Sequence, residues 1–244
     1  MNNQATRWAL DRRGKVGSDM LFDNVTDSVS LVDKYRPQSL ADMVGQVGNI
    51  QAMERFVHRP YSCGMLLHGP SGTGKTTAAM CLARALGCDE KAQEFGGLMQ
   101  IASGEQTAQG VRDALRWLWL IPMYGSGWRV LIVNESDRMA LAAETVWLDA
   151  LENLPPRALV VFTTNRPDSL SDRLRDRCES YDFAQPVDDC IEHVKALALR
   201  VWTGEGRQGE PKGLKLRYAS DGQVSYRRLV QSMSEAMRSC AVAS

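Results

Sequence analysis

The fold is decided by the stretch GPSGTGKTT at residues 69–77, which has the spacing GxxxxGK[ST] of a phosphate-binding loop. An apolar run, MLLH at 65–68, precedes this stretch, and an alanine-rich helical pattern follows it. Glycines let successive backbone N–H groups curl around phosphate oxygens, and the start of a helix adds partial positive charge there. The residues expected to surround the phosphates are Gly69, Pro70, Ser71, Gly72, Thr73, Gly74, Lys75, Thr76 and Thr77.

Two side chains of this loop have separate tasks. Lys75 is expected to reach the β and γ oxygens of a triphosphate, and Thr76 to offer its hydroxyl to Mg²⁺. The alternative is an ordinary glycine-rich turn, and the flanking strand and helix patterns weigh against it. The sequence therefore predicts a site for ATP and Mg²⁺.

Outward from the loop, apolar runs alternate with helical patterns. Strands are expected at 65–68, 98–101, 130–133 and 159–163, and helices at 75–86, 108–120 and 142–154. Runs such as VLIV and LVVF lack polar alternation, which is typical of strands covered by helices on both faces. We therefore expect an α/β fold, a P-loop NTPase with a doubly wound, parallel, five-stranded sheet.

The chain divides by pattern into three parts. Residues 1–30 have little periodicity and are expected to form a flexible N-terminal extension. Residues 31–186 carry the α/β pattern of the nucleotide-binding domain. From residue 187 to 244 the strands are expected to stop, and the pattern predicts a small helical lid interrupted by a glycine-rich segment at 204–213.

Composition restricts the function classes. Lys plus Arg equals Asp plus Glu at 29 each, so no overall positive charge indicates nucleic acid. The six cysteines have no paired CxxC spacing, and the N-terminus lacks a secretory pattern, so reduced thiols are expected rather than disulfides or zinc. With no apolar stretch long enough to cross a bilayer, we expect a cytoplasmic protein, associated with the nucleoid if it is bacterial or viral.

A second polar motif follows the buried run at 130–133. The sequence WRVLIVNESD places Glu135 where a general base for ATP hydrolysis is expected, and Asn134 where an aspartate would orient Mg²⁺. The expected metal-site residues are thus Thr76, Asn134 and Glu135, partly through water. Asn134 keeps an acceptor oxygen but lacks the charge, so we expect weaker Mg²⁺ binding or slower turnover. A merely polar strand end is the alternative.

Ahead of the loop, DKYRPQSLADMVGQ at 33–46 resembles the entry segment of the AAA+ clamp-loader ATPases, that is, replication factor C small subunits and bacterial DNA polymerase III clamp-loader motor subunits. The resemblance covers roughly residues 31 to 235. It implies that the adenine and ribose of ATP lie against Tyr35, Arg36, Pro37, Val44 and Gly45. It also implies that the start of the helix expected at 108–120 faces DNA, whereas Leu148 and Asp149 stand where relatives have basic residues.

The same resemblance assigns three further residues. LVVFTTN resembles the sensor 1 strand, in which Asn165 would bond to the γ-phosphate or the attacking water. RDRCES resembles the segment whose arginine, here Arg177, reaches the ATP of a neighbouring subunit in trans. The alternative for Arg177 is a surface salt bridge, and Arg173 and Arg175 are expected to pair locally or lie in solvent. SYRRLVQSM resembles the sensor 2 helix. Only one of its adjacent arginines can face the nucleotide, and we expect Arg227.

Three functions remain open at this stage. The first is an ATP-hydrolysing clamp-loader subunit that joins AAA+ subunits, the same or related, in a ring or spiral on primer-template DNA, with a sliding clamp as a further partner. The second is a weakly hydrolysing scaffold subunit of a hetero-oligomer. The third is a Holliday-junction or replication-restart AAA+ ATPase. We expect no membrane partner, and no collar domain of the clamp-loader kind after the lid.

Overall fold

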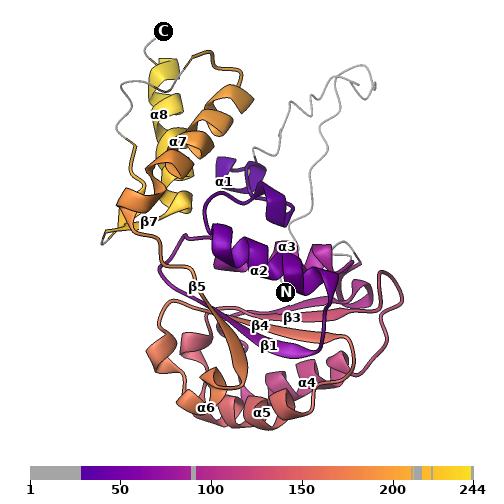
Figure 1. Ribbon diagram of the computed structural model, residues 1–244. Helices are drawn as coiled ribbons and strands as arrows, with labels where there is room; N and C mark the ends of the chain where they lie inside the picture. The colour runs from indigo at the N-terminus through magenta and orange to yellow at the C-terminus, as the bar shows by residue number, and fades with distance from the viewer. Residues whose placement is uncertain (1–28, 89–91, 210, 212–215, 221, 243–244) are drawn as a thin grey trace, which may run out of the picture. The chain divides into compact units, whose positions relative to one another are not determined.

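Five parallel strands form a sheet in the order β2-β3-β4-β1-β5 (Figure 1). In chain order they are β1 Cys63–His68, β2 Leu98–Ile101, β3 Arg129–Val133, β4 Ala158–Thr164 and β5 Cys178–Asp182. Every neighbouring pair in this sheet is parallel. The fold class predicted from the sequence is therefore confirmed.

The computed structural model describes residues 29–88, 92–209, 211, 216–220 and 222–242. Residues 31–244 form one compact unit. The N-terminal extension expected at 1–30 lies outside the described residues except for its last two, and the division into domains at residues 186 and 187 stays a prediction. In the described part of the chain, no helix is both long and apolar enough to span a membrane.

Helices cover both faces of the sheet because successive strand residues point to opposite sides. Figure 1 shows α2 and α3 on one side of the sheet and α4, α5 and α6 on the other. Met65 and Leu67 of β1 pack in the cluster with α2 and α3, whereas Leu66 packs in the cluster with α4, α5 and α6. The bounds of these helices are α2 Val47–His58, α3 Lys75–Ala85, α4 Ala108–Leu118, α5 Leu141–Glu152 and α6 Asp172–Arg175. Short 3-10 helices are η1 Leu40–Asp42, η2 Gln93–Gly96, η3 Ser136–Arg138 and η4 Pro167–Ser169.

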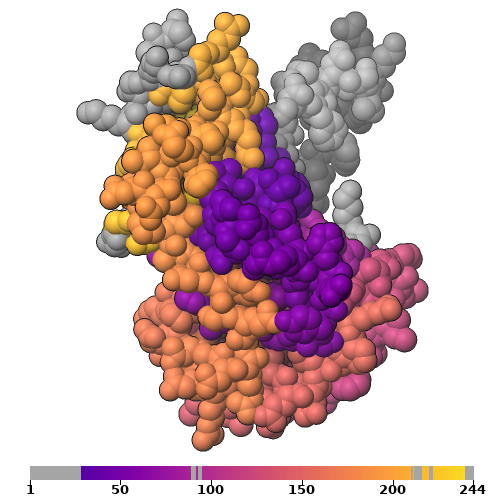
Figure 2. Space-filling model, viewed as in Figure 1, coloured from indigo at the N-terminus to yellow at the C-terminus, as the bar shows by residue number. Residues whose placement is uncertain are grey.

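A third apolar cluster lies among α1 Leu31–Lys34, α7 Val187–Gly204 and α8 Tyr226–Val242. Leu197 and Leu229 are buried within it, and Val32 and Tyr35 pack against it. Residues just after α1 pack instead on α3, as Leu40 does. Figure 2 shows the corresponding indigo atoms against both the C-terminal helices and the rest of the unit. The segment at 31–46 thus connects the helical cluster to the sheet.

The predicted elements lie within two residues of the observed ones at each end. Two strand assignments need correction. β5 reads CESYD and is only half-buried at an edge of the sheet, so it lacks the apolar run that marks the other strands. Strands also do not stop at residue 186, because β6 Ala219–Ser220 and β7 Gln223–Val224 form an antiparallel pair. Two-residue strands carry no periodicity that a sequence reading could detect.

Cys63, Cys81, Cys88, Cys178 and Cys190 are free thiols. Cys81 and Cys88 are buried, and burial raises the pKa of Cys88 to about 12. Such thiols remain protonated near neutral pH and behave as small apolar groups.

Candidate nucleotide site

The phosphate loop connects β1 to α3 at the carboxyl edge of the sheet, where ligands bind in open α/β folds. Gly74 has φ +100° and directly precedes α3, whose first residue is Lys75. Gly72 has φ +83°, and a Cβ there would lie 2.1 Å from the Ser225 hydroxyl oxygen. Both positions require glycine, one for backbone conformation at the helix start and the other also for close approach of the residues before α8.

Lys75 is buried at the centre of this loop. Its ammonium group donates to the carbonyls of Gly69 at 2.6 Å and Pro70 at 2.7 Å, and to Asn165 Oδ1 at 2.9 Å. Burial lowers the pKa of Lys75 to about 8, and the positive charge of Arg227 contributes to the same shift. The loop therefore encloses a partly desolvated cation that anionic oxygens would stabilise.

Two of the three predicted metal residues, Thr76 and Asn134, are in direct contact. Thr76 Oγ1 donates to Asn134 Oδ1 at 3.2 Å, and Asn134 Nδ2 donates to Gln100 Oε1 at 3.2 Å. Gln106, which is buried, also donates to the backbone carbonyl of Asn134. The bond to Gln100 turns the amide nitrogen away and leaves the oxygen of Asn134 beside the threonine hydroxyl. Two oxygen donors side by side suit Mg²⁺, which prefers oxygen ligands and keeps several waters.

The general-base candidate lies beyond the end of β3. Glu135 has φ +51°, its side chain is about half exposed, and its carboxylate lies 3.8 Å from Arg138. Asp137 does not line the cavity, because it accepts from Thr164 Oγ1 at 3.2 Å and pairs with Arg166 at 3.5 Å. Glu135 is thus the carboxylate in the cavity wall, although the charges of both Asp137 and Glu135 favour the charged form of Lys75.

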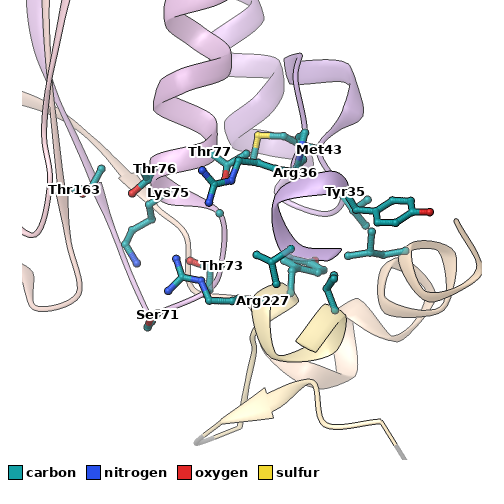
Figure 3. A pocket seen from close by; sticks show the side chains of 18 of the residues that line it. Tyr35, Arg36, Met43, Ser71, Thr73, Lys75, Thr76, Thr77, Thr163 and Arg227 are labelled. Atoms are coloured by element: carbon teal, nitrogen blue, oxygen red, sulfur yellow. The ribbon is translucent and has the colours of Figure 1, made fainter. Parts of the chain in front are cut away.

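A cavity of about 150 Å³ brings most of the predicted residues together. Figure 3 shows Lys75, Thr73 and Ser71 on the loop with Arg227 reaching toward them from α8, and Tyr35 at the opposite side. The predicted residues in its wall are Tyr35, Arg36, Pro37, Val44, Ser71, Gly72, Thr73, Gly74, Lys75, Thr76, Thr77, Glu135, Asn165 and Arg227.

The other predicted residues lie outside this wall. Gly69 and Pro70 contribute the carbonyls that hold Lys75, and Asn134 touches Thr76. Gly45, at φ +74°, lies under Tyr226, whose hydroxyl would be 2.2 Å from an added Cβ. Each of these four positions supports the wall from behind.

Arg177, Arg227 and Arg228 have different surroundings. Arg227 lines the cavity, whereas Arg228 does not and donates to the carbonyl of Ala219 at 3.4 Å. Arg177 is not in the wall either, and its Nε donates to Glu152 at 3.0 Å. Within this chain Arg177 thus forms a surface ion pair with Glu152, and its reach to the ATP of another subunit stays a prediction.

Sequence reasoning missed the side of the cavity formed by helices. Tyr226, Leu197 and Arg200 line it, and Arg200 also donates to the carbonyl of Asp42 at 3.1 Å. Further wall residues that were missed are Val32, Met43, Thr163, Thr164 and Val230. A helical pattern marks α7 and α8 in the sequence, but it does not tell which turn of each helix meets a distant segment.

Comparison with known proteins agrees with this geometry. A family model described as "ATPase family associated with various cellular activities (AAA)" matches residues 65–185. The replication factor C small subunit of Haloarcula marismortui is 29% identical over 79% of this chain and 58% of its own length. That of Halobacterium salinarum is 28% identical over 84% of this chain and 62% of its own length. The chain thus spans about three fifths of these relatives.

Solved structures share the fold. A mutant form of Thermotoga maritima RuvB has a TM-score of 0.60 at 20% identity, over 86% of this chain and 68% of that one. A DNA polymerase III gamma subunit-related protein of the same organism has a TM-score of 0.50 at 20% identity, over 63% of this chain and 51% of that one. These structures show the fold alone. The AAA family model over residues 65–185 and the replication factor C relatives make this chain similar to the clamp-loader-like ATPases of the AAA family.

Proposed function

We propose that this chain binds ATP with Mg²⁺ and hydrolyses it as one subunit of a clamp-loader-like assembly that acts on DNA in replication or repair. The observation that carries the proposal is the cavity in which Lys75, Glu135, Asn165 and Arg227 surround one space at the phosphate loop. Each of these residue types has a separate task in phosphoryl transfer to water. The replication factor C relatives support the choice of assembly.

Binding of ATP would replace hydrogen bonds that Lys75 already makes within the site. Lys75 is held by two loop carbonyls and by Asn165, so a triphosphate would replace some of these bonds with stronger, charge-assisted ones. At the other end, Tyr35, Val44 and Leu197 offer aromatic and apolar surface to a base. ATP would therefore lie with its phosphates on the loop and its adenine toward α7 and α8.

Hydrolysis would depend on residues at the ends of β3 and β4. Glu135 would accept a proton from the attacking water, and Asn165 would orient that water or the γ-phosphate. Thr76 and Asn134 would hold Mg²⁺, which neutralises charge on the phosphate oxygens. Arg227 would stabilise charge developing on the phosphates from the helical side.

The amide at position 134 favours a second function. Asn134 supplies an oxygen beside Thr76 but no negative charge, so we propose that Mg²⁺ binding and turnover are attenuated. In the limit of very slow turnover, the subunit would serve mainly as a nucleotide-dependent scaffold in a hetero-oligomer. An Asn134→Asp variant distinguishes the two functions, because only an attenuated site gains turnover.

An exposed apolar surface supports a protein partner such as a sliding clamp. It consists of side chains on the turn after α4 and on η2, namely Phe95, Trp119, Leu120, Ile121, Met123 and Tyr124. The turn is fixed rather than frayed, because the N–H groups of Met123 and Tyr124 donate to the Phe95 carbonyl at 3.1 and 3.2 Å. Contiguous exposed apolar groups of this kind mark interaction surfaces.

The experiment that tests the proposal measures ATP binding, turnover and particle mass of the full chain. We expect Mg²⁺-dependent ATP binding, a larger particle in the presence of ATP, and turnover that changes with primer-template DNA and a clamp. Glu135→Gln should bind ATP but lose turnover. A response to four-way junctions and not to primer-template DNA would favour a junction ATPase instead, and absence of nucleotide binding would refute the proposal.

A further inference from the structure

The segment that carries Arg177 is attached to α5 at two points. At its start, the backbone N–H of Ser171 donates to the buried Glu144 at 2.9 Å. At its end, Arg177 donates to Glu152, the last residue of α5, from Nε at 3.0 Å and also from Nη2. One helix thus fixes both ends of the short segment from residue 171 to 177.

Some N–H groups of the Arg177 guanidinium are not used by its contact with Glu152. A guanidinium has about five N–H donors. Glu152 accepts from Nε and Nη2, and the carbonyl of Arg173 accepts from Nη1 at 3.0 Å. Three donors are used and two remain, one on each terminal nitrogen. The side chain is still 33% exposed, so this remaining fork has the geometry that binds phosphate oxygens in pairs.

Helix stability does not explain a glutamate at this position. The carboxyl end of a helix carries partial negative charge and favours cations, yet Glu152 ends α5 and no basic residue lies in the last turn. The ion pair with Arg177 offsets this local repulsion. The arginine is therefore the group that makes a negative charge tolerable there.

We propose that Glu152 is a positioning residue for Arg177. It holds the guanidinium by its Nε–Nη2 edge and so presents the other edge to the phosphates of ATP in a neighbouring subunit. The proposal rests on the function proposed above, in which Arg177 acts in trans. Because Glu152 touches no substrate, its loss should affect turnover in the neighbour and leave ATP affinity unchanged.

Mixing two disabled forms of the full chain tests this inference. Lys75→Ala subunits lack a working site but offer Arg177, while Arg177→Ala subunits keep the site but lack the arginine. Turnover above the sum of the separate samples measures the arginine acting in trans. Donors that also carry Glu152→Gln should restore about two- to fivefold less maximal turnover, the range expected for a partly exposed ion pair, with the same KM for ATP.

Matched variants separate positioning from structure. Glu192→Gln removes the exposed partner of Lys195 on α7 and should leave restoration unchanged. Glu152→Asp keeps the charge on a shorter stem and should fall between wild type and Glu152→Gln. Adding Glu152→Gln to subunits that already lack Arg177 should change nothing.

The outcomes are distinct. If Glu152→Gln donors restore turnover as well as or better than their parent, Glu152 does not position the arginine and the inference is wrong. If Glu152→Gln lowers turnover equally in subunits without Arg177, its role is structural and the inference is also wrong. If no donor restores turnover, Arg177 does not act in trans, and the assembly part of the proposed function fails together with the inference.

Discussion

The two ends of the nucleotide cavity are built in different ways. The phosphate end comes from one continuous stretch, residues 71–77, together with the ends of β3 and β4. The opposite end, which we call the base end, combines residues 32–44 with Leu197 and Arg200 of α7 and Tyr226 and Val230 of α8. The phosphate end therefore depends mainly on the backbone geometry of one loop, to which α8 adds Arg227, whereas the base end depends on packing between distant segments.

This difference predicts how each end responds to change. The phosphate end should lose function when a charge or a backbone N–H is lost, with little effect on folding. The base end should respond to anything that shifts the helical cluster, because its wall exists only while α1, α7 and α8 stay packed. A backbone bond joins the ends, because the N–H of Tyr226 donates to the Gly72 carbonyl at 3.0 Å. The Tyr226 hydroxyl donates instead to Gln185, after β5, at 2.8 Å.

The largest effect is expected at the phosphate end, from Lys75→Ala. Removing the buried ammonium should weaken ATP binding by about two orders of magnitude, the size found for close charge pairs in desolvated sites. Calorimetry with ATP and Mg²⁺ measures this loss. Lys195→Ala, an exposed lysine on α7, is the matched control and should bind normally. Equal ATP affinity of the two variants would show that binding at the phosphate end does not depend on the charge of Lys75.

A smaller effect is expected at the base end, from Gly45→Ala. A side chain at φ +74° costs about 1–2 kcal/mol, and its Cβ would also lie 2.2 Å from the Tyr226 hydroxyl. Thermal or urea unfolding should show the lost stability, and ATP affinity should fall because Tyr226 is displaced. Gly48→Ala in α2 is the control, since open space surrounds its Cβ. A free energy of unfolding equal to that of the wild type would show that Tyr226 can move away from the added Cβ without loss of stability.

The pKa of Lys75 gives the third prediction. It is lowered to about 8 in the absence of nucleotide, mainly by burial, whereas bound phosphates favour the charged form. ATP affinity should therefore be constant below pH 8 and fall above it, by up to about tenfold per pH unit. Titrations across this range measure the slope. In Lys75→Arg, whose guanidinium stays charged, the slope should disappear. A constant affinity of the wild type up to about pH 10 would contradict a depressed pKa.

The smallest effect is expected from Asn134→Asp. A carboxylate beside Thr76 adds a charged oxygen for Mg²⁺, so turnover should rise about threefold and half-saturation should require less Mg²⁺. Turnover measured across Mg²⁺ concentrations checks both quantities. Asn153→Asp, at an exposed asparagine beyond α5, controls for added negative charge. No gain over this control would mean that the amide does not limit the site.

The same contrast shows what the sequence could predict of the site. Lys75, Thr76, Asn134 and Glu135 were foreseen together because the ends of parallel strands meet at one edge of a sheet. The structure places Thr76 and Asn134 in direct contact. Tyr226 and Arg200 were not foreseen as wall residues, because their helical patterns define a buried face without naming its partner.

Most helices and strands, the parallel sheet and the phosphate loop could be predicted from the sequence. Apolar periodicity and glycine spacing are local patterns, and each one reflects the conformation of the residues that carry it. Only the tertiary structure decided that β5 joins the sheet edge, that residues 31–35 pack with the C-terminal helices, and that Glu152 meets Arg177. These contacts join residues far apart in the chain. They depend on the angle at which helices pack and on which turn of each helix meets its neighbour. No local sequence pattern specifies either of these.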